Sequence, residues 1–403
     1  MSDFDVVVVG AGPGGLAAGE AAARAGCSVL ILEQGQEIGS PTRTTGGSFV
    51  QELRRLDIPE HLYHPITRCR FVSPRHSAGF DYDEPVLCVI DVRGVFQFLA
   101  ERAVQAGARI RMGVAAIKPI LEHDITVGVK AKTRTGANLT VHSRILIDAT
   151  GYRAAMLKQA GLHPGFRRFG AGSEYDLYAP RCKEDEVVLI VGTQIAPSGY
   201  AWVFPWGRKR VRVGVGIIHG DSMEHPDAYL DRFIERSAQF GVNLEGAQPI
   251  EYHYGLIPSD GLAKMFTGNG ILGVGDAAGQ SSALAGEGIR WAIKAGRMAG
   301  AVAGKAVAAN DVSQRFLRQY QQQWEAAFGT NLRIAYEINK KIAQFSDEEW
   351  DKNTELLTQL NPNEFGQALQ TNLAGAWAIQ FLCSHPRLLT EGLRKIGRSL
   401  KNS

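Results

Sequence analysis

The sequence predicts an α/β protein in which a parallel-sheet domain, built from separate segments, is interleaved with an antiparallel β-sheet domain and followed by a helical tail. Three observations predict this fold. Apolar runs typical of parallel strands occur near the start of the chain, near residue 145 and near residue 272. Part of the intervening sequence alternates apolar and polar residues, as half-buried antiparallel strands do. The length of 403 residues suits about two to three such units.

The first segment reads as strand, tight turn, helix and strand. Val6–Val9 is a β-branched run, as expected for a strand that is covered on both faces. A glycine-rich turn over residues 10–15 breaks this strand, and an alanine-rich helix follows to about Ala25. The second strand, over residues 27–32, ends at Glu33. This order of elements is typical of one half of a nucleotide-binding sheet.

The middle of the chain contains both kinds of strand. Asp91 predicts the N-cap of a helix that ends at Gly107. Residues 143–148 form another apolar strand. Tyr200–Phe204 and Val211–Val215 alternate with period two around a short turn of glycine and basic residues, which predicts a β-hairpin.

The last third begins with a strand over residues 270–275, which opens a second glycine cluster and leads into a long helix from about Gly286. Small residues recur along this helix, and we expect it to pack closely on the first domain. From Gln314 onward the chain reads as helical and polar. The expected units are a discontinuous first domain over 1–75, 90–170 and 265–310, an antiparallel domain over 76–89 and 171–264, and a C-terminal helical region over 311–403.

Composition excludes several classes of protein. Hydrophobic residues make up 45% of the chain and charged residues 21%, which is typical of a globular protein and unlike a disordered or low-complexity one. Lysine and arginine number 44 and aspartate and glutamate 41, so the net charge is only +3. That charge is too weak to indicate nucleic acid as a partner.

The cysteines and the apolar runs indicate where in the cell the protein is expected. The five cysteines are scattered and show no Cys-x-x-Cys spacing, which favours reduced thiols and indicates no metal site. The strand that starts at about Asp5 leaves no room for a signal peptide, so we expect a cytoplasmic protein. No apolar run approaches the roughly 18 residues that cross a bilayer. Any membrane contact is therefore expected to be peripheral.

The first glycine turn has the spacing Gly10-x-Gly12-x-x-Gly15 between a strand and a helix. The first glycine allows the tight turn, the second lets a pyrophosphate approach the backbone, and the third allows helix and strand to pack closely. Glu33 would accept hydrogen bonds from a ribose diol. FAD and NAD both fit this motif.

The second glycine cluster favours FAD. It reads Gly273–Gly279, with Gly275-Asp276 at its centre, and is followed by Gly286-Glu287-Gly288-Ile289. Asp276 offers an acceptor for a ribitol hydroxyl, and the glycine-flanked helix start offers backbone N–H groups for the pyrimidine edge of a flavin. A second site so far along the chain suits a long cofactor, whereas NAD alone would not require it.

Together these motifs resemble the Rossmann-like, glutathione-reductase-type FAD fold in its p-hydroxybenzoate-hydroxylase branch, and most closely the geranylgeranyl reductase family. The second cluster is similar to that family's third FAD motif, and Tyr200-x-Trp202-x-Phe204-Pro205 matches its Tyr-x-Trp-x-Phe-Pro signature. The resemblance covers about residues 4–310. It implies that Tyr200 and Trp202, which share one face of their strand, line an apolar cavity beside the flavin.

Three departures from the family pattern concern the substrate more than the cofactor. The family's Lys-Pro-Cys-Gly-Gly-Gly loop, which faces the flavin, reads Arg43-Thr44-Thr45-Gly46-Gly47-Ser48 here, so Thr45 stands in place of the cysteine. Ala283 replaces the proline before the Gly-Glu-Gly motif. Asp148-Ala149-Thr150-Gly151 resembles the Ala-Thr-Gly type of flavoprotein motif and not the Ala-Asp-Gly form of the hydroxylases.

The motifs and the resemblance predict the site residues. The expected catalytic residues are Tyr200, Trp202 and Thr45, with Tyr200 as the candidate proton donor. No metal ligands are expected. The expected cofactor-binding residues are Gly10, Gly12, Pro13, Gly14, Gly15, Glu33, Gln34, Arg43, Arg93, Asp148, Gly151, Gly275, Asp276, Gly286, Glu287, Gly288 and Ile289.

The resemblance implies an FAD-dependent oxidoreductase that reduces carbon–carbon double bonds of an isoprenoid or other apolar polyene by hydride transfer from reduced flavin N5. NAD(P)H or another external reductant would be the electron donor, and the expected partner is an apolar small molecule. Two alternatives remain open: a monooxygenase that uses a C4a-hydroperoxide, and a non-redox flavoprotein cyclase or isomerase. Residues 377–401 mix apolar and basic side chains, which suits either an interfacial helix that delivers a lipid or a packed terminal helix.

Overall fold

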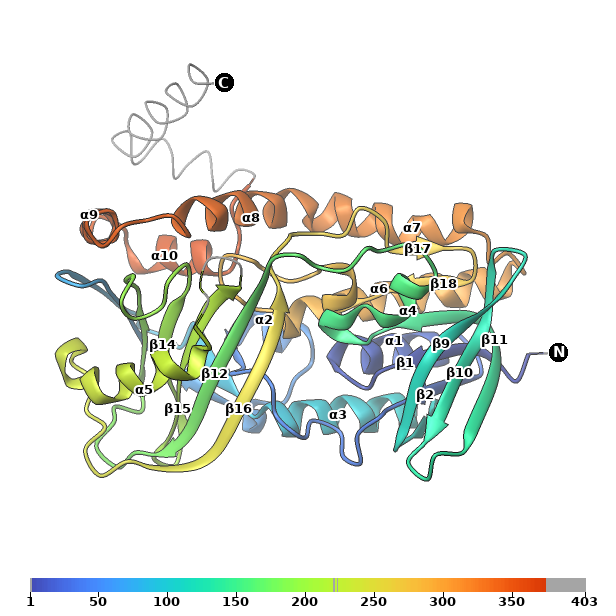
Figure 1. Cartoon of the computed structure of the whole chain (residues 1–403), viewed down its shortest axis with the longest axis horizontal. Coiled ribbons are helices and arrows are strands. Elements are labelled where there is room, and N and C mark those ends of the chain that lie inside the picture. Colours follow the sequence, from blue (N-terminus) through green and yellow to red (C-terminus); the bar gives the residue numbers. More distant parts are fainter. Residues whose placement is uncertain (1, 220–221, 223, 375–403) are drawn as a thin grey trace, which may run out of the picture.

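The parallel sheet lies in the half of the molecule that carries the N-terminus (Figure 1). The computed structural model describes residues 2–219, 222 and 224–374. Its eight-stranded sheet has the order β17-β18-β11-β1-β2-β8, and β10 and β9 extend it in antiparallel fashion from β11. The strands are β1 (Phe4–Val9), β2 (Val29–Leu32), β8 (Arg109–Arg111), β9 (Val114–Glu122), β10 (Ile125–Thr133), β11 (Asn138–Asp148), β17 (Thr267–Gly268) and β18 (Ile271–Gly273).

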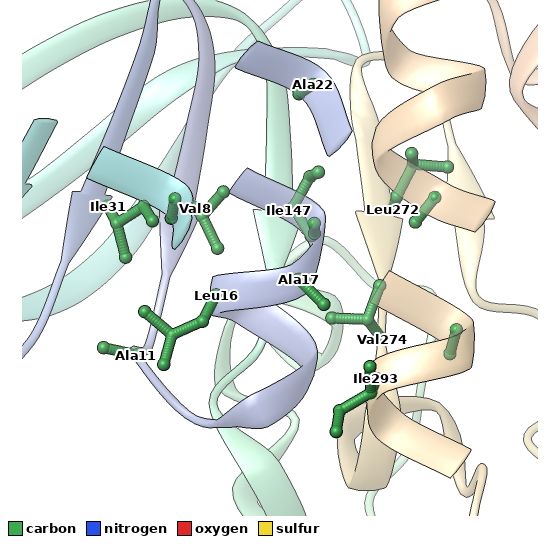
Figure 2. Packing of buried hydrophobic residues seen from close by; sticks show 14 of the residues in the cluster. Val8, Ala11, Leu16, Ala17, Ala22, Ile31, Ile147, Leu272, Val274 and Ile293 are labelled. Atoms are coloured by element: carbon green, nitrogen blue, oxygen red, sulfur yellow. The ribbon is translucent and has the colours of Figure 1, made fainter. Parts of the chain in front are cut away.

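The core of this domain lies between the sheet and its helices. Strand β1 pairs in parallel with two strands, and Val8 lies opposite both Ile147 of β11 and Ile31 of β2. All three side chains are fully buried. Figure 2 shows them beside Leu16 and Ala17 of helix α1 (Pro13–Arg24). The β-branched run predicted to be covered on both faces is therefore confirmed.

Helix α6 (Ile289–Ala308) packs closely against α1, as its small residues predict. A Cβ atom at Gly296 would lie 2.2 Å from the carbonyl oxygen of Gly14, and one at Gly300 would lie 2.3 Å from that of Ala18. The two backbones therefore approach each other at positions where no larger residue fits.

Helix α3 (Val92–Gln105) covers α1 from another direction. Asp91 is its N-cap, as predicted, because its side chain accepts a hydrogen bond of 2.9 Å from the Gly94 N–H. Two short helices, α2 (Val50–Arg55) and α4 (Ala155–Gln159), complete this half of the molecule.

A seven-stranded sheet forms the other half, where Figure 1 shows β12, β14, β15 and β16 side by side. Its order is β16-β12-β15-β14-β13-β5-β6, and all of its pairs are antiparallel except β13 with β5. Helix α5 (Pro226–Arg236) packs on β12 and β15. The strands are β5 (Arg68–Val72), β6 (Ser77–Asp81), β12 (Phe169–Tyr178), β13 (Glu186–Ile190), β14 (Tyr200–Gly207), β15 (Arg210–His219) and β16 (Gln248–Pro258).

The predicted hairpin forms between β14 and β15, where Val203 lies opposite Val213. Strand β5 differs from expectation. The expected ranges place residues 1–75 in the first domain, but Arg68 of β5 pairs with Glu186 of β13 in the antiparallel sheet. The other expected segment of that sheet, 76–89, is divided, because β7 (Leu87–Ile90) joins a three-stranded sheet with β3 (Gly47–Phe49) and β4 (Tyr63–Ile66). Strand pairing over such separations depends on tertiary packing and leaves no local signal.

The described part of the C-terminal region, up to residue 374, is mostly helical, and helices α9 and α10 lie over the antiparallel sheet (Figure 1). The ring of Phe365 stacks on Phe80 of β6 with centroids 3.9 Å apart. A π-helical turn joins the first two helices of the region. These helices are α7 (Gln314–Trp324), α8 (Thr330–Ile342), α9 (Asp347–Leu357) and α10 (Pro362–Leu369).

Two expectations concern membranes. Across the part of the chain that the structure describes, no helix has the length and apolar character needed to span a bilayer. Residues 377–401, for which an interfacial or a packed helix is expected, lie outside the described residues.

Candidate cofactor and substrate site

A continuous cavity of about 1990 Å³ runs between the two sheets. Sites for single small ligands usually measure about 300–1,000 Å³, so this cavity has room for a cofactor and a further molecule. The glycine turns of the parallel-sheet domain line one end. Apolar side chains from the antiparallel sheet and the C-terminal helices line the other end.

The first glycine turn has the geometry that its spacing predicts. Gly10 has φ of +107°, and a Cβ there would lie 2.3 Å from the carbonyl oxygen of Ala149. A Cβ at Gly15 would lie 2.0 Å from the carbonyl oxygen of Gly10. At Gly12, in contrast, a Cβ would meet nothing within 4 Å, because this residue faces the cavity. The turn therefore leaves open the space that a pyrophosphate needs at the start of α1.

Glu33 closes the same end of the cavity. One carboxylate oxygen accepts a hydrogen bond of 2.8 Å from the Ala11 N–H, and the other accepts one of 2.7 Å from the Gly35 N–H. The carboxylate thus holds the glycine turn in place. Each oxygen keeps a further lone pair, so Glu33 can also accept hydrogen bonds from a ribose.

The second glycine turn places Asp276 on the cavity wall. No described residue donates a hydrogen bond to its side chain, and one carboxylate oxygen lies 3.3 Å from where a Cβ of Gly288 would be. Burial raises the pKa of this carboxyl to about 7. A carboxylate that faces the cavity and has no donor among the described residues indicates that a ligand supplies one, and a sugar-alcohol hydroxyl is a suitable donor.

We expect replacement of Asp276 by asparagine to stabilise the apoprotein at alkaline pH and to weaken its hold on FAD. The unfolded carboxyl titrates near 3.8, whereas the folded one titrates near 7. Between these values the folded state keeps a proton that the unfolded state has lost, so the wild-type apoprotein loses stability as pH rises. The variant should be more stable than wild type by at least about 1 kcal/mol at pH 8, and the difference should vanish below pH 4.

Urea unfolding of the apoproteins across this pH range measures the effect, and the flavin absorbance of purified holoprotein measures retention. The exposed Asp83 offers a matched control. Asp83→Asn should change neither quantity. Equal FAD retention in the two variants would contradict the role of Asp276.

Beneath the second turn lies a buried ionic cluster. The Arg290 side chain is 2% exposed, and its Nε donates to both oxygens of Glu287 at 2.9 and 2.6 Å. Its other nitrogens reach Glu52, at 3.3 Å, and the backbone carbonyl of Gln370, at 2.7 Å. Lys294 also pairs with Glu52. Arg290 therefore ties the Gly286–Ile289 turn to the end of α10, a connection that the sequence did not reveal.

The structure does not bring two of the predicted cofactor-binding residues to the cavity wall. Asp148 is fully buried, and its carboxylate accepts four hydrogen bonds, from the N–H and hydroxyl of Thr150 and the N–H groups of Met156 and Leu157. It caps α4, so the prediction of a cofactor contact is corrected to a structural role. The guanidinium of Arg93 is largely exposed and pairs with Glu37. Glu37, not Arg93, lines the cavity.

All other predicted site residues line the cavity. Tyr200 and Trp202 lie on one face of β14, as predicted, with ring centroids 5.7 Å apart. The Tyr200 hydroxyl donates to the carbonyl oxygen of Ala285 at 2.7 Å, next to the second glycine turn. The Trp202 ring rests on Gly214 of β15, where a Cβ would lie only 2.3 Å from it.

Thr45 and Trp202 share a partner that the sequence analysis missed. The Thr45 hydroxyl lies 2.6 Å from Oε2 of Glu174, and the indole Nε1 of Trp202 donates to the same oxygen at 2.8 Å. Glu174, in β12, is 3% exposed. Its local signal in the sequence is weak, because the same strand also contains Asp176.

The apolar end of the cavity is also closed by residues that the sequence analysis did not single out. Helices α8, α9 and α10 supply one wall, and β5, β13 and β14 supply the opposite wall. Trp350 and Phe365 contact Phe71 of β5. The C-terminal helices therefore form part of the cavity wall. Their apolar lining residues include Ile334, Ile338, Ile342, Phe345, Leu356, Leu357, Leu360 and Leu369.

These observations fit FAD. The open space at Gly12 suits a pyrophosphate, Glu33 suits a ribose, and the unpartnered Asp276 suits a ribitol hydroxyl. One cavity connects the two glycine turns. Within the described ranges, no group of His, Cys, Asp and Glu side chains has the arrangement of a metal site.

Comparison with known proteins agrees with this geometry. The family model for FAD-dependent oxidoreductases matches residues 5–178, and the model for the geranylgeranyl reductase catalytic domain matches residues 171–257. The chain is 35% identical to digeranylgeranylglycerophospholipid reductase 2 of Methanopyrus kandleri, over 88% of this chain and 90% of that protein. It is 32% identical to the Methanocaldococcus jannaschii reductase of the same name, over 88% and 90% of the two chains.

Solved structures show the same fold. A geranylgeranyl bacteriochlorophyll reductase-like protein of Thermoplasma acidophilum matches 96% of this chain and 98% of its own with a TM-score of 0.86 and 26% identity. The flavin-dependent brominase Bmp2, at 18% identity, shares the fold alone, with a TM-score of 0.72 over 97% of this chain and 99% of its own. Sequence, fold and cavity agree that this chain is an FAD-dependent oxidoreductase and belongs to the geranylgeranyl reductase family.

Proposed function

We propose that this enzyme reduces carbon–carbon double bonds in the isoprenoid chains of a glycerolipid. The observation that carries the proposal is the continuity of the cavity, which leads from the two glycine turns past Tyr200 and Trp202 to an apolar end that the C-terminal helices close. An apolar chain fits there beside the cofactor. The names of the relatives, digeranylgeranylglycerophospholipid reductases, support this substrate class.

The residues of the chain bind the cofactor, orient the substrate and exclude water. Bound FAD, when reduced, supplies the hydride for the double bond. Gly12, Glu33 and Asp276 would hold the cofactor along its length. Tyr200 and Trp202 would position the double bond beside it. The apolar walls keep water away from the reacting carbons, which prevents side reactions.

We further propose that NAD(P)H or another external reductant donates the electrons, because each reduced double bond consumes one hydride. A lipid substrate also requires access to a membrane surface. A cytoplasmic protein with peripheral membrane contact meets that requirement.

Product mass tests the proposal. Holoenzyme is mixed anaerobically with a geranylgeranyl-chain glycerolipid and dithionite, and the lipid is analysed by mass spectrometry. Reduction adds two hydrogens for each bond, whereas isomerisation leaves the mass unchanged. In a parallel sample in which the reduced holoenzyme is exposed to oxygen, hydroxylation would add one oxygen atom, which is the signature of the monooxygenase alternative. A lipid of unchanged mass would overturn the proposed reaction.

A further inference from the structure

A chain of hydrogen bonds connects the cavity with the protein surface. The Thr45 hydroxyl lies 2.6 Å from Oε2 of Glu174, and Oε1 of Glu174 lies 2.8 Å from Nδ1 of His253. Nε2 of His253 lies 3.0 Å from Glu251. The Glu174 and His253 side chains are 3% and 5% exposed, whereas the Glu251 side chain is 57% exposed. Each link is short enough for a proton to pass.

The inner end of this chain lies beside the reaction site. Thr45, Glu174 and His253 all line the cavity. The indole of Trp202 donates to the same Glu174 oxygen that contacts Thr45. The Trp202 ring in turn contacts Tyr200, whose hydroxyl is bonded next to the second glycine turn. The chain of hydrogen bonds therefore ends where the double bond and the cofactor are expected to meet.

The charges around His253 favour its protonated form. Burial alone would lower the pKa of the imidazole, but its hydrogen bonds to Glu174 and Glu251 outweigh burial and raise that pKa. The cation Arg212, on β15, opposes the increase. Arg212 in turn pairs with Asp176, and Arg210 approaches Glu251 at 3.9 Å. The carboxylates of Glu174 and Glu251, which both contact His253, thus retain a proton on this histidine close to the cavity.

Tyr200 is the proton donor that the sequence suggests. It is less suited than Thr45 to deliver a proton to the substrate. Its hydroxyl proton is committed to the carbonyl oxygen of Ala285. Burial, and then the charge of Glu287, raise the pKa of this phenol to about 12. The Tyr200 hydroxyl has no hydrogen-bonded acid among the described residues that could return a proton to it, whereas the Thr45 hydroxyl contacts the Glu174 carboxyl group, which leads to His253.

We propose that Thr45, Glu174 and His253 form the proton-delivery path of the reduction, with Thr45 as the residue that contacts the substrate and Glu174 and His253 as positioning residues behind it. This inference rests on the proposed function, because the reduction of a double bond by a hydride consumes one proton at the second carbon. Thr45 occupies the position at which the geranylgeranyl reductase family often has a cysteine.

One carbon of the double bond receives a hydride, with both electrons, from the reduced flavin. The other carbon takes the hydroxyl proton of Thr45, so a C–H bond forms and the O–H bond breaks. The carboxylate of Glu174 takes the proton from His253 Nδ1 and passes it to the Thr45 oxygen, so Thr45 regains its O–H bond and Glu174 is a carboxylate again. The neutral His253 is then reprotonated from solvent through Glu251.

Single-turnover kinetics test the path. Wild-type holoenzyme and variants are reduced with dithionite, freed of excess reductant and mixed anaerobically with a geranylgeranyl-chain glycerolipid from pH 5 to pH 9. The readouts are the rate of flavin reoxidation and the product mass. The exposed His76 provides a matched control, because its side chain lies in a surface turn away from the cavity.

We expect Glu174→Gln and His253→Gln to slow the reaction at least about 100-fold while FAD content stays at the wild-type level. The wild-type rate should fall as pH rises through the raised pKa of His253, since the proton donor is lost there. That decline should be absent in His253→Gln and present in His76→Gln. Thr45→Ser should retain most of the rate, and Thr45→Val should lose it.

Three results would overturn the path: a Glu174→Gln rate within threefold of wild type, a wild-type pH profile in His253→Gln, or equal rates in the two Thr45 variants. The Thr45 pair decides the matter if Glu174→Gln does not fold. A wild-type enzyme that leaves the lipid mass unchanged would instead refute the proposed function. Normal reduction by wild type together with unaffected variants would refute the proton path alone.

Discussion

Replacing Gly12 with valine is expected to abolish FAD binding and leave the fold intact. Gly12 has φ of −74° and ψ of 175°, a conformation open to any residue. A Cβ there would meet no protein atom within 4 Å. The added side chain would instead fill the space above the start of α1, where the pyrophosphate approaches the backbone. We expect at least about a 100-fold loss of affinity, or ~2.7 kcal/mol.

Isothermal titration of apoprotein with FAD measures this affinity, and circular dichroism during heating measures the fold. Gly79 gives a matched control, because a Cβ there also meets nothing within 4 Å and the residue does not line the cavity. Gly79→Val should bind FAD normally. Gly15→Val should fail to fold, since its Cβ would lie 2.0 Å from the Gly10 carbonyl oxygen. Normal FAD binding by Gly12→Val would refute the location of the pyrophosphate.

Replacing Arg290 with alanine is expected to destabilise the holoprotein by about 3–5 kcal/mol. The guanidinium is 2% exposed and is the direct partner of Glu287 and a partner of Glu52, which are 9% and 7% exposed. Its removal leaves the buried Glu287 without a direct cationic partner, whereas Glu52 keeps Lys294 and Arg55. It also releases the carbonyl of Gln370 and with it the attachment of α10 to the second glycine turn.

Urea denaturation followed by far-ultraviolet circular dichroism measures this loss. Lys340 provides a control, because its ion pair with Glu337 lies on the surface, with the two side chains 42% and 61% exposed. Lys340→Ala should change the unfolding free energy by no more than about 1 kcal/mol. If Arg290→Ala unfolded at the same urea concentration as wild type, the buried cluster would contribute nothing to stability.

The elements that local pattern predicts agree with the structure. The run Val6–Val9 forms part of β1, Asp91 caps α3, and the alternating residues on either side of Gly207 form the β14–β15 hairpin. Tyr200 and Trp202 share a face because successive side chains of a strand alternate. The glycines of the first turn have the φ angles and close contacts that their spacing implies. In each case the determining interactions lie within a few residues.

The predictions that did not hold depend on distant parts of the chain. Asp148 ends a strand, as many cofactor-binding acids do, but its carboxylate turns toward α4. The role of Arg93 near the FAD phosphates, which the resemblance implies, stays a prediction, since its side chain pairs with Glu37, which lines the cavity. Strand β5 reads equally well in either domain, and only its pairing with β13 assigns it to the antiparallel sheet.

The sequence by itself determined the α/β class, the two glycine turns that suit FAD, and the aromatic pair beside them. Only the tertiary structure decided that α8 to α10 close the apolar end of the cavity, and that Thr45, Glu174 and His253 form one chain of hydrogen bonds. The physical reason is the distance along the chain between the residues that interact. Backbone conformation and strand alternation follow from neighbouring residues, whereas a hydrogen bond between residues 45 and 174 exists only after the loop before β3 has packed against the antiparallel sheet.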